Sequence, residues 1–133
     1  MSGNDRLKEA TSGGSVAILT DLDPAIVKSD SLTGNVVSLE GKAPGVFYDL
    51  KLEPRLLERV VGSKEDLNVE PIKKNENLML NVNSSVSVGI VDNFKNNKIH
   101  LVLKRPLCIS KGDRITLSRM IGARWRLIGV SEL

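Results

Sequence analysis

The sequence predicts an all-β protein whose main part is an antiparallel β-barrel. Short runs of alternating apolar and polar residues follow one another closely, clusters of Gly, Asn, Asp, Ser and Pro separate them, and no long stretch has a helical period. Aromatic residues make up only 3% of the 133 residues, so we expect a core of Val, Ile and Leu, which pack well on a pleated sheet. Closely spaced strands joined by short turns favour a sandwich or small barrel, in which closure removes exposed edges.

The individual elements follow from this alternation. We expect strands over residues 46–52, 78–82, 85–90, 99–104, 114–120 and 125–130. In the run 85–90, the residues Val86, Val88 and Ile90 share one side and Ser85, Ser87 and Gly89 the other, and one of these sets must face the core. Turn signals at 92–97, 110–113 and 121–123 separate the later strands. Residues 54–58 begin with Pro and predict a turn of helix.

The domain boundary is expected at residues 39–45, where Gly, Lys and Pro indicate a linker. Residues 46–133 are long enough for a complete barrel. Residues 1–45 are too short to bury a core alone, because segments near 40 residues usually need a staple or a partner. We therefore expect an incomplete unit that docks on the barrel, docks on a further segment, or stays partly loose.

The charge is distributed unevenly along the chain. Residues 1–92 carry 10 basic and 14 acidic residues, a sum of −4, whereas residues 93–133 carry 9 basic and 2 acidic residues, a sum of +7. This split favours an anionic partner for the C-terminal end, either RNA or an acidic protein face, although a solvated basic face that aids solubility fits equally well.

The basic residues of this segment are the best chemical feature. The candidate contacts to RNA or to another subunit are Lys104, Arg105, Lys111, Arg114, Arg119, Arg124 and Arg126, opposed between them by Asp113 alone. Arg124 and Arg126 flank Trp125, so in a strand both guanidinium groups project from one face, which suits phosphate contacts. The competing interpretation pairs them with carboxylates elsewhere. We expect Trp125 itself to be the large aromatic residue of the core.

Catalytic and metal-binding sets are not evident in the sequence. His100 is the sole histidine and lies mid-strand, where we expect no ligand role, and no zinc site of the usual His/Cys composition can form. Cys108 is the sole cysteine, which excludes an internal disulfide and fits a reducing compartment. Between two apolar neighbours it is expected to be a buried structural thiol rather than a reactive one. Asp21 and Asp23, followed by Pro24, favour a turn over a metal site.

Nucleotide-binding signatures also fail to match. A P-loop requires Gly-x-x-x-x-Gly-Lys-Ser/Thr, and no such string is present. Gly13-Gly14-Ser15 predicts a short turn, and residues 97–100 lack the acid of the guanine-reading Asn-Lys-x-Asp. We therefore expect no GTP site, no cofactor and no enzymatic activity in this chain. The N-terminus lacks a signal-peptide layout and no apolar run approaches the ~20 residues of a membrane span, so a cytoplasmic location is expected.

Five strings together resemble one protein family. They are residues 23–30 (Asp-Pro-Ala-Ile-Val-Lys-Ser-Asp, followed by Leu32, Gly34 and Val36-Val37), 56–62 (Leu-Leu-Glu-Arg-Val-Val-Gly), 78–82 (Leu-Met-Leu-Asn-Val), 112–119 (Gly-Asp-Arg-Ile-Thr-Leu-Ser-Arg) and 124–129 (Arg-Trp-Arg-Leu-Ile-Gly). In order and spacing, from about Gly13 onward, the chain resembles the gamma subunit of archaeal and eukaryotic translation initiation factor 2.

This resemblance implies an architecture and a positional role, in which the chain would help to position initiator tRNA and the other subunits on the small ribosomal subunit. The family belongs to the elongation-factor-Tu-like GTPases, in which a GTPase domain precedes two β-barrels. Residues 1–45 would then be the end of the second barrel and residues 46–133 the whole third domain. The implied partners are the GTPase domain of the same factor, which would hold GTP and Mg²⁺, the alpha and beta subunits, initiator tRNA and the small ribosomal subunit.

Several positions depart from the family pattern. Ser12 replaces a Pro, residues 17–19 replace a Gly-rich strand, Asn83 replaces a Gly, and Met120 replaces a second Arg after Arg119, which puts a phosphate contact at Arg119 in doubt. A different class of function stays open, namely a free-standing β-barrel that binds RNA or an acidic protein through its basic C-terminal region. A related barrel from a selenocysteine elongation factor is a third interpretation, which the string Arg-Trp-Arg-Leu-Ile-Gly at residues 124–129 disfavours.

Overall fold

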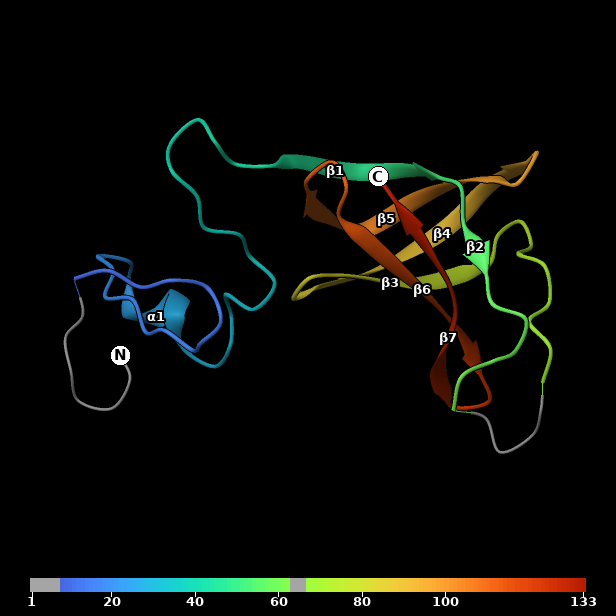
Figure 1. Ribbon diagram of the computed structural model, residues 1–133, viewed down its shortest axis with the longest axis horizontal. Helices are drawn as coiled ribbons and strands as arrows, with labels where there is room; N and C mark the ends of the chain where they lie inside the picture. The colour runs from blue at the N-terminus through green and yellow to red at the C-terminus, as the bar shows by residue number, and fades with distance from the viewer. Residues whose placement is uncertain (1–7, 63–66) are drawn as a thin grey trace. The chain divides into compact units, whose positions relative to one another are not determined.

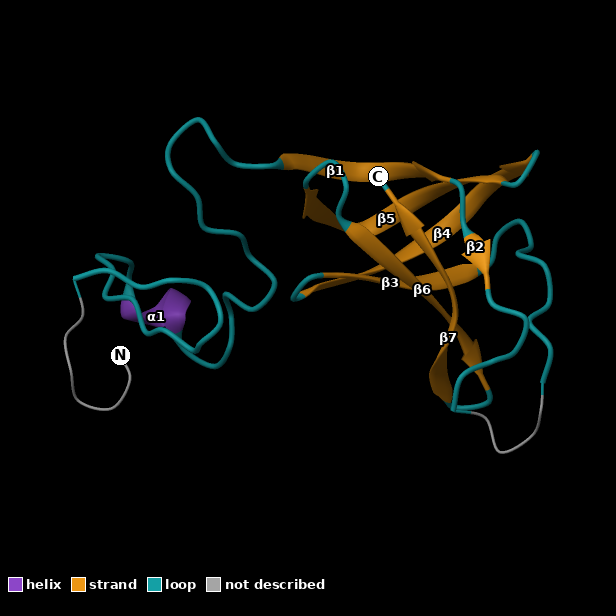
Figure 2. Cartoon of the chain, viewed as in Figure 1, coloured by secondary structure: helices purple, strands orange, loops and turns teal. Residues whose placement is uncertain are grey.

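The computed structural model describes residues 8–62 and 67–133 and confirms the all-β class (Figures 1 and 2). Residues 1–7, on which the expectation about a signal peptide rests, lie outside the described part. The elements are α1 (Pro24–Val27), β1 (Gly45–Leu52), β2 (Arg55–Leu56), β3 (Asn77–Val82), β4 (Ser85–Lys95), β5 (Lys98–Ile109), β6 (Arg114–Ile121) and β7 (Arg124–Glu132). No helix among the described residues has the length and apolar character needed to cross a membrane.

The strands form one antiparallel sheet that curls into a barrel. Its order is β1-β5-β4-β3-β6-β7-β2, so β1 and β2 are the two ends of the row. Only Glu53 and Pro54 separate these strands in the chain, and the three steps from Leu52 to Arg55 span at most about 11 Å. The two ends must therefore meet at this corner, which Figure 1 shows as a sharp bend between β1 and β2. The Ser131 hydroxyl of β7 donates to the Glu53 carbonyl across it, at 3.3 Å.

The interior is aliphatic, as the scarcity of aromatic residues predicts. All the buried members of the core cluster are Val, Ile or Leu. The most deeply buried side chains come from every long strand and include Leu50, Leu78, Leu80, Val91, Leu101, Ile115, Leu117 and Ile128. Alternating residues of β3, β5 and β6 supply most of these side chains. The two-residue alternation in the sequence therefore predicted correctly which side chains of these strands face the core.

Strand β4 turns its small residues inward. The buried set is Ser85, Ser87 and Gly89, whereas Val86 and Ile90 are 49% and 39% exposed. The space allows only small groups, since a Cβ added to Gly89 would lie 3.2–3.3 Å from Leu103, Leu80 and Leu101. Each buried hydroxyl finds an acceptor, because Ser87 donates to the Arg105 carbonyl at 2.7 Å and Ser85 donates to that of Gly34.

The expected helical turn at 54–58 is wrong. This stretch forms β2, which pairs Arg55 with Val130 and Leu56 with Gly129 of β7. The Leu57 amide then donates to the Ile128 carbonyl at 2.8 Å. The backbone of β7 needs partners along this side, and that tertiary requirement outweighs the local preference of a Pro-led segment.

The chain divides into two compact units between Leu32 and Thr33, and the domain boundary expected at 45/46 stays a prediction. Among the described residues before β1, helix α1 is the single regular element. Asp23 caps it, accepting the Ala25 amide at 2.8 Å with Pro24 at the first helical position. The apolar side chains of this stretch are exposed, among them Ile18, Leu19, Val37 and Leu39.

We expect residues 8–44 to be cleaved before the barrel in limited proteolysis. Their apolar side chains are exposed and no strand pairs their backbone, so local opening there costs little free energy. Trypsin should cut after Lys28 or Lys42 on the order of tenfold faster than at any site from β3 to β7. Intact-mass spectrometry of a time course measures both rates, and equal rates would contradict this expectation.

Candidate functional site

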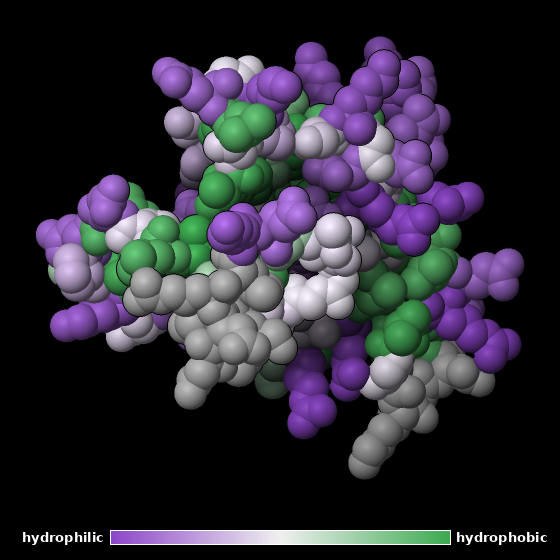
Figure 3. Space-filling model, turned by 60° about the vertical axis from the view of Figure 1, so that its left-hand side comes forward, coloured by the Kyte–Doolittle hydropathy of each residue, from purple (hydrophilic) through white to green (hydrophobic). Residues whose placement is uncertain are grey.

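The predicted basic residues are distributed over β5, the β5–β6 turn, β6 and β7, and the β6–β7 register puts Arg119 opposite Arg126. Lys104 and Arg105 are in β5, Lys111 and Arg114 are in and after the β5–β6 turn, Arg119 is in β6, and Arg124 and Arg126 begin β7. Figure 3 shows hydrophilic side chains of all kinds at several places on the face in view, with hydrophobic ones between them. The prediction that these residues contact RNA or another subunit stays a prediction, and each place is best considered by itself.

Lys104 and Arg105 lie in the part of β5 where its pairing with β1 is interrupted. The β1–β5 pairing runs from Phe47 opposite Leu107 to Asp49 opposite Val102, so the register jumps across the two basic residues. Both side chains are exposed. The Arg105 backbone is nevertheless held, because its carbonyl accepts from the Ser87 hydroxyl at 2.7 Å. This bulge presents two cations on a fixed backbone.

Lys111 and Arg114 belong to a well-formed turn. The Asp113 carboxylate accepts the Ser110 amide at 2.8 Å, and the Asp113 amide donates back to the Ser110 carbonyl at 3.1 Å. Gly112 has a φ of +88°, which the turn requires and a glycine adopts without strain. Arg114 stands opposite Glu132 in the β6–β7 register. Asp113, the acidic residue that lies among the predicted basic contacts, therefore holds the turn through these two hydrogen bonds.

The guanidinium group of Arg119 donates hydrogen bonds to other groups of the protein. Its Nε atom donates to Glu76, its Nη2 atom donates to the second Glu76 oxygen at 3.1 Å, and further bonds reach the carbonyls of Glu70 at 2.9 Å and Pro71 at 3.2 Å. The Arg119 and Glu76 side chains are only 14% and 16% exposed. This arrangement ties the segment before β3 to β6, which leaves Arg119 little capacity for an external phosphate.

Arg124 and Arg126 share one face of the start of β7, as the i, i+2 spacing predicts. Neither pairs with a carboxylate among residues 8–62 and 67–133. Arg124 is exposed and Arg126 half-buried. The Arg126 guanidinium lies against Gly62, where an added Cβ would come within 2.8 Å of Nη1. Arg124 and Arg126 are thus two of the seven predicted residues whose guanidinium groups lie on the same face of a strand and have no carboxylate partner among the described residues.

The expectation that Trp125 fills the core is wrong. Trp125 is half-buried, pairs with the exposed Met120 of β6, and does not belong to the core cluster. Strand alternation puts it on the face opposite the two arginines, and aliphatic side chains already fill the interior. Cys108 is also half-buried instead of buried, with its Sγ atom 3.4 Å from the Pro44 carbonyl oxygen.

His100 has polar partners that the sequence did not reveal. It lies in a strand, as predicted, but its Nε2 atom is 3.0 Å from an Asp49 oxygen and its Nδ1 atom 3.2 Å from an Asp92 oxygen. The hydrogen bond with Asp49, followed by that with Asp92, raises the pKa of His100 above its ordinary value. Sequence offered no signal for this cluster, because one carboxylate is 51 positions away. The described residues contain no group of three metal-ligating side chains arranged to hold a metal ion.

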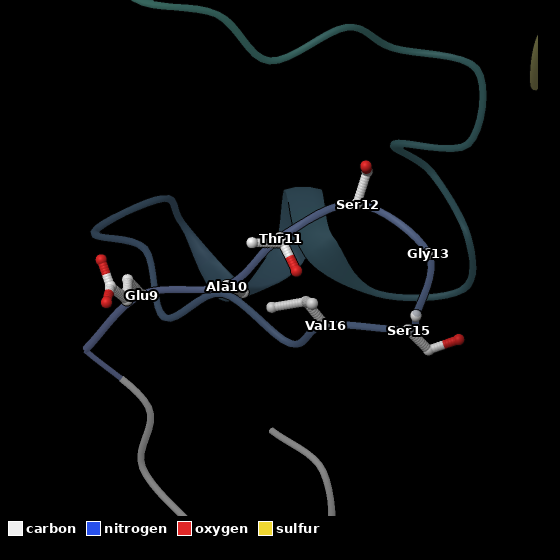
Figure 4. A pocket seen from close by; sticks show the side chains of 8 residues that line it. Glu9, Ala10, Thr11, Ser12, Gly13, Ser15 and Val16 are labelled. Atoms are coloured by element: carbon white, nitrogen blue, oxygen red, sulfur yellow. The ribbon is translucent and has the colours of Figure 1, made fainter.

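One hollow lies at the loop that contains the Gly pair. It is lined by consecutive residues from Glu9 to Val16, including Gly13-Gly14-Ser15 (Figure 4). Figure 4 shows the Ser12 side chain pointing away from the loop. Among the described residues, the lining holds no Lys or Arg, and Glu9 is its charged side chain.

Comparison with known proteins relates the chain to one family. The family described as initiation factor eIF2 gamma, C terminal, matches residues 48–133. Relatives named translation initiation factor 2 subunit gamma come from Methanococcus maripaludis, with 48% identity over 127 residues, Pyrococcus furiosus, with 49% over 128, and Methanothermobacter thermautotrophicus, with 47% over 129. These alignments cover 96–97% of this chain but only 31–32% of each relative. The chain thus spans about a third of the length of the curated relatives it matches.

Proposed function

The chain belongs to the translation initiation factor 2 gamma family, of which it represents the C-terminal part, and from this premise we propose that it helps to position initiator tRNA and the other subunits on the small ribosomal subunit. Its role is positional. In this proposal GTP and Mg²⁺ are held by a GTPase domain of the whole factor, and the chain contributes no catalytic group of its own.

The observation that supports this role is the extent of the relatedness. Identity near 48% continues through 127 residues, across both compact units. The exposed apolar side chains of residues 8–39 agree with it, because an incomplete unit needs further protein to cover them. The proposed partners are the GTPase domain of the same factor, the alpha and beta subunits, and initiator tRNA.

Within this role, Arg124 and Arg126 are the proposed contact to RNA or to a subunit. Their guanidinium groups project from one face of β7 and have no carboxylate partner among the described residues. Guanidinium groups bind phosphate and carboxylate oxygens through paired N–H donors, which are the groups that RNA and an acidic protein face present. Arg119 stands opposite Arg126, but its donors already bind Glu76 and two backbone carbonyls, so Arg124 and Arg126 are the pair to test first.

The double variant Arg124→Ala, Arg126→Ala should weaken assembly by roughly thirtyfold or more while the fold is kept, since each lost charge-assisted contact costs about 1 kcal/mol or more and two such losses add to about 2 kcal/mol. The measurement joins this chain to the preceding two thirds of the Pyrococcus furiosus relative, adds alpha and beta subunits, and titrates initiator tRNA at several salt concentrations. If the arginines touch phosphates, the salt dependence of binding should also become shallower.

A matched control is the double variant Lys95→Ala, Lys98→Ala, which removes the same charge from exposed positions of the β4–β5 hairpin that are not among the predicted contacts. It should leave affinity within about twofold. An equal loss of affinity in both double variants would mean that binding depends on the net charge of the chain and that the two arginines of β7 make no specific contact. Tight, salt-sensitive binding of RNA by the chain alone, without the other subunits, would favour the free-standing binding module instead.

A further inference from the structure

Three adjacent strands meet at one charged cluster on the outer face of the barrel. His100 of β5 lies between Asp49 of β1 and Asp92 of β4, with nitrogen–oxygen distances of 3.0 and 3.2 Å. Its neighbours Ile99 and Leu101 point into the core and are 1% and 0% exposed, so the ring faces outward. The imidazole is 27% exposed, whereas the two carboxylates are 58% and 61% exposed.

The geometry requires a particular protonation state. Each ring nitrogen faces a carboxylate oxygen, and an ionised carboxylate can only accept hydrogen bonds. The imidazolium has two N–H groups and can donate to both carboxylates at once. A neutral ring has one N–H, so its other nitrogen would turn a lone pair toward a negative oxygen. Both contacts therefore exist together only while His100 is charged.

Strand pairing places both carboxylates at the ring. Asp92 is the residue left over where the β4–β5 register shifts between Val91 and Asn93, and a bulge of this kind redirects a side chain that a regular strand would place elsewhere. Asp49 lies two residues before Lys51, the register partner of His100, so regular alternation puts it on the same face of the sheet as the ring. A bulge in β4 and the regular pairing of β1 thus bring two carboxylates to the single histidine of the chain.

We propose that Asp49, His100 and Asp92 form a pH-sensitive clasp that fastens the edge strand β1 to the barrel, closed when His100 is protonated and released on one side when it is neutral. Strand β1 is the element that should respond. Among the strands of the described residues, β1 pairs with β5 alone, whereas β4 is held between β5 and β3. This inference does not depend on the proposed role in translation.

The other charged groups around the ring are lysines, which act against protonation, and no hydrogen bond joins any of them to the ring among the described residues. Lys51 of β1 stands opposite His100, Lys98 is two residues away on β5, and Lys95 of β4 pairs with Lys98 at the end of the hairpin. The two carboxylates are in direct hydrogen-bonding contact, and their effect exceeds the cost of partial burial, so the pKa of His100 is raised.

The direction of the pH effect follows from this raised pKa. Protons bind the folded state more tightly than the unfolded state, so the stabilisation is fully present below the ordinary histidine value of about 6.5. It is lost as the pH rises from that value through the raised pKa of the folded protein. Above this window β1 should open more often, by about tenfold for each unit by which the pKa is raised.

The first test is an NMR titration of His100, which needs no assignment because the chain has one histidine. The wild-type pKa should lie above the ordinary value, and both Asp49→Asn and Asp92→Asn should lower it. Glu132→Gln, which removes an exposed acid on β7, should leave it unchanged. A wild-type pKa at or below the ordinary value, or one that only a single Asp variant alters, would overturn the two-sided clasp.

The second test measures amide hydrogen-exchange protection of residues 45–52 in the full chain at about pH 6 and about pH 9, corrected for the intrinsic pH dependence of exchange. In the wild type, the opening constant of β1 should rise by the factor that the NMR titration gives. His100→Gln, which cannot carry the charge, should show no such rise, while β3 amides serve as the internal reference. An equal rise in both proteins, or no rise in the wild type, would refute the clasp.

Discussion

Replacement of Arg119 by Met is expected to lower the stability of the barrel by about 2–3 kcal/mol. Removing one partner of a buried ion pair costs about 3–5 kcal/mol because the other charge is left uncompensated, and slight exposure of this pair reduces the effect. Glu76 would lose two hydrogen bonds, and the carbonyls of Glu70 and Pro71 would each lose one. The segment carrying the buried Ile72 would then lose its fastening to β6.

Thermal and urea unfolding measure this change, and the expected fall in Tm is on the order of 10 °C or more for a barrel of this size. Glu76→Gln and the double variant complete a mutant cycle, whose coupling free energy should exceed about 1 kcal/mol. Lys104→Met removes a cation from an exposed position and should change stability by less than about 0.5 kcal/mol. If Arg119→Met behaved like this control, the ion pair would contribute nothing to the fold.

Replacement of Gly129 by Ala is expected to open the corner where the barrel closes. The added Cβ would lie 2.8 Å from the Arg55 carbonyl oxygen and 3.2 Å from the Leu56 Cα atom. Both are backbone atoms, so β2 would have to move away from β7, and only two residue pairs join these strands. Overpacking of this kind costs about 1–3 kcal/mol, and part of the β2–β7 pairing would be lost with it.

Chemical unfolding gives the free energy, and hydrogen exchange at the Leu57 amide, which donates to the Ile128 carbonyl, reports the corner directly. Gly14→Ala is the matched control, because a Cβ there meets nothing within 4 Å and its φ is not positive. It should leave stability within about 0.5 kcal/mol. Protection of Leu57 that survives in Gly129→Ala would show that β2 tolerates the methyl group.

The features that the sequence predicted correctly are local or repetitive. Alternation of apolar residues located the long strands, and the scarcity of aromatic residues predicted an aliphatic core. The pattern around Arg124 and Arg126 correctly put both on one face, because that relation depends on strand geometry alone. The five family strings pointed to translation initiation factor 2 gamma, and the comparisons confirm that family.

The tertiary structure decided everything that depends on which strands become neighbours. Trp125 stayed outside the core because an aliphatic interior was already complete, and residues 55–56 became a strand because β7 needed a partner. Arg119 found Glu76 43 positions away, and His100 found Asp49 51 positions away. No local pattern encodes such pairs, since they arise when strand order and register shifts bring distant side chains together. The sequence by itself therefore determined the strands and the family, and tertiary packing determined which charged side chains bond within the protein and which stay exposed at its surface.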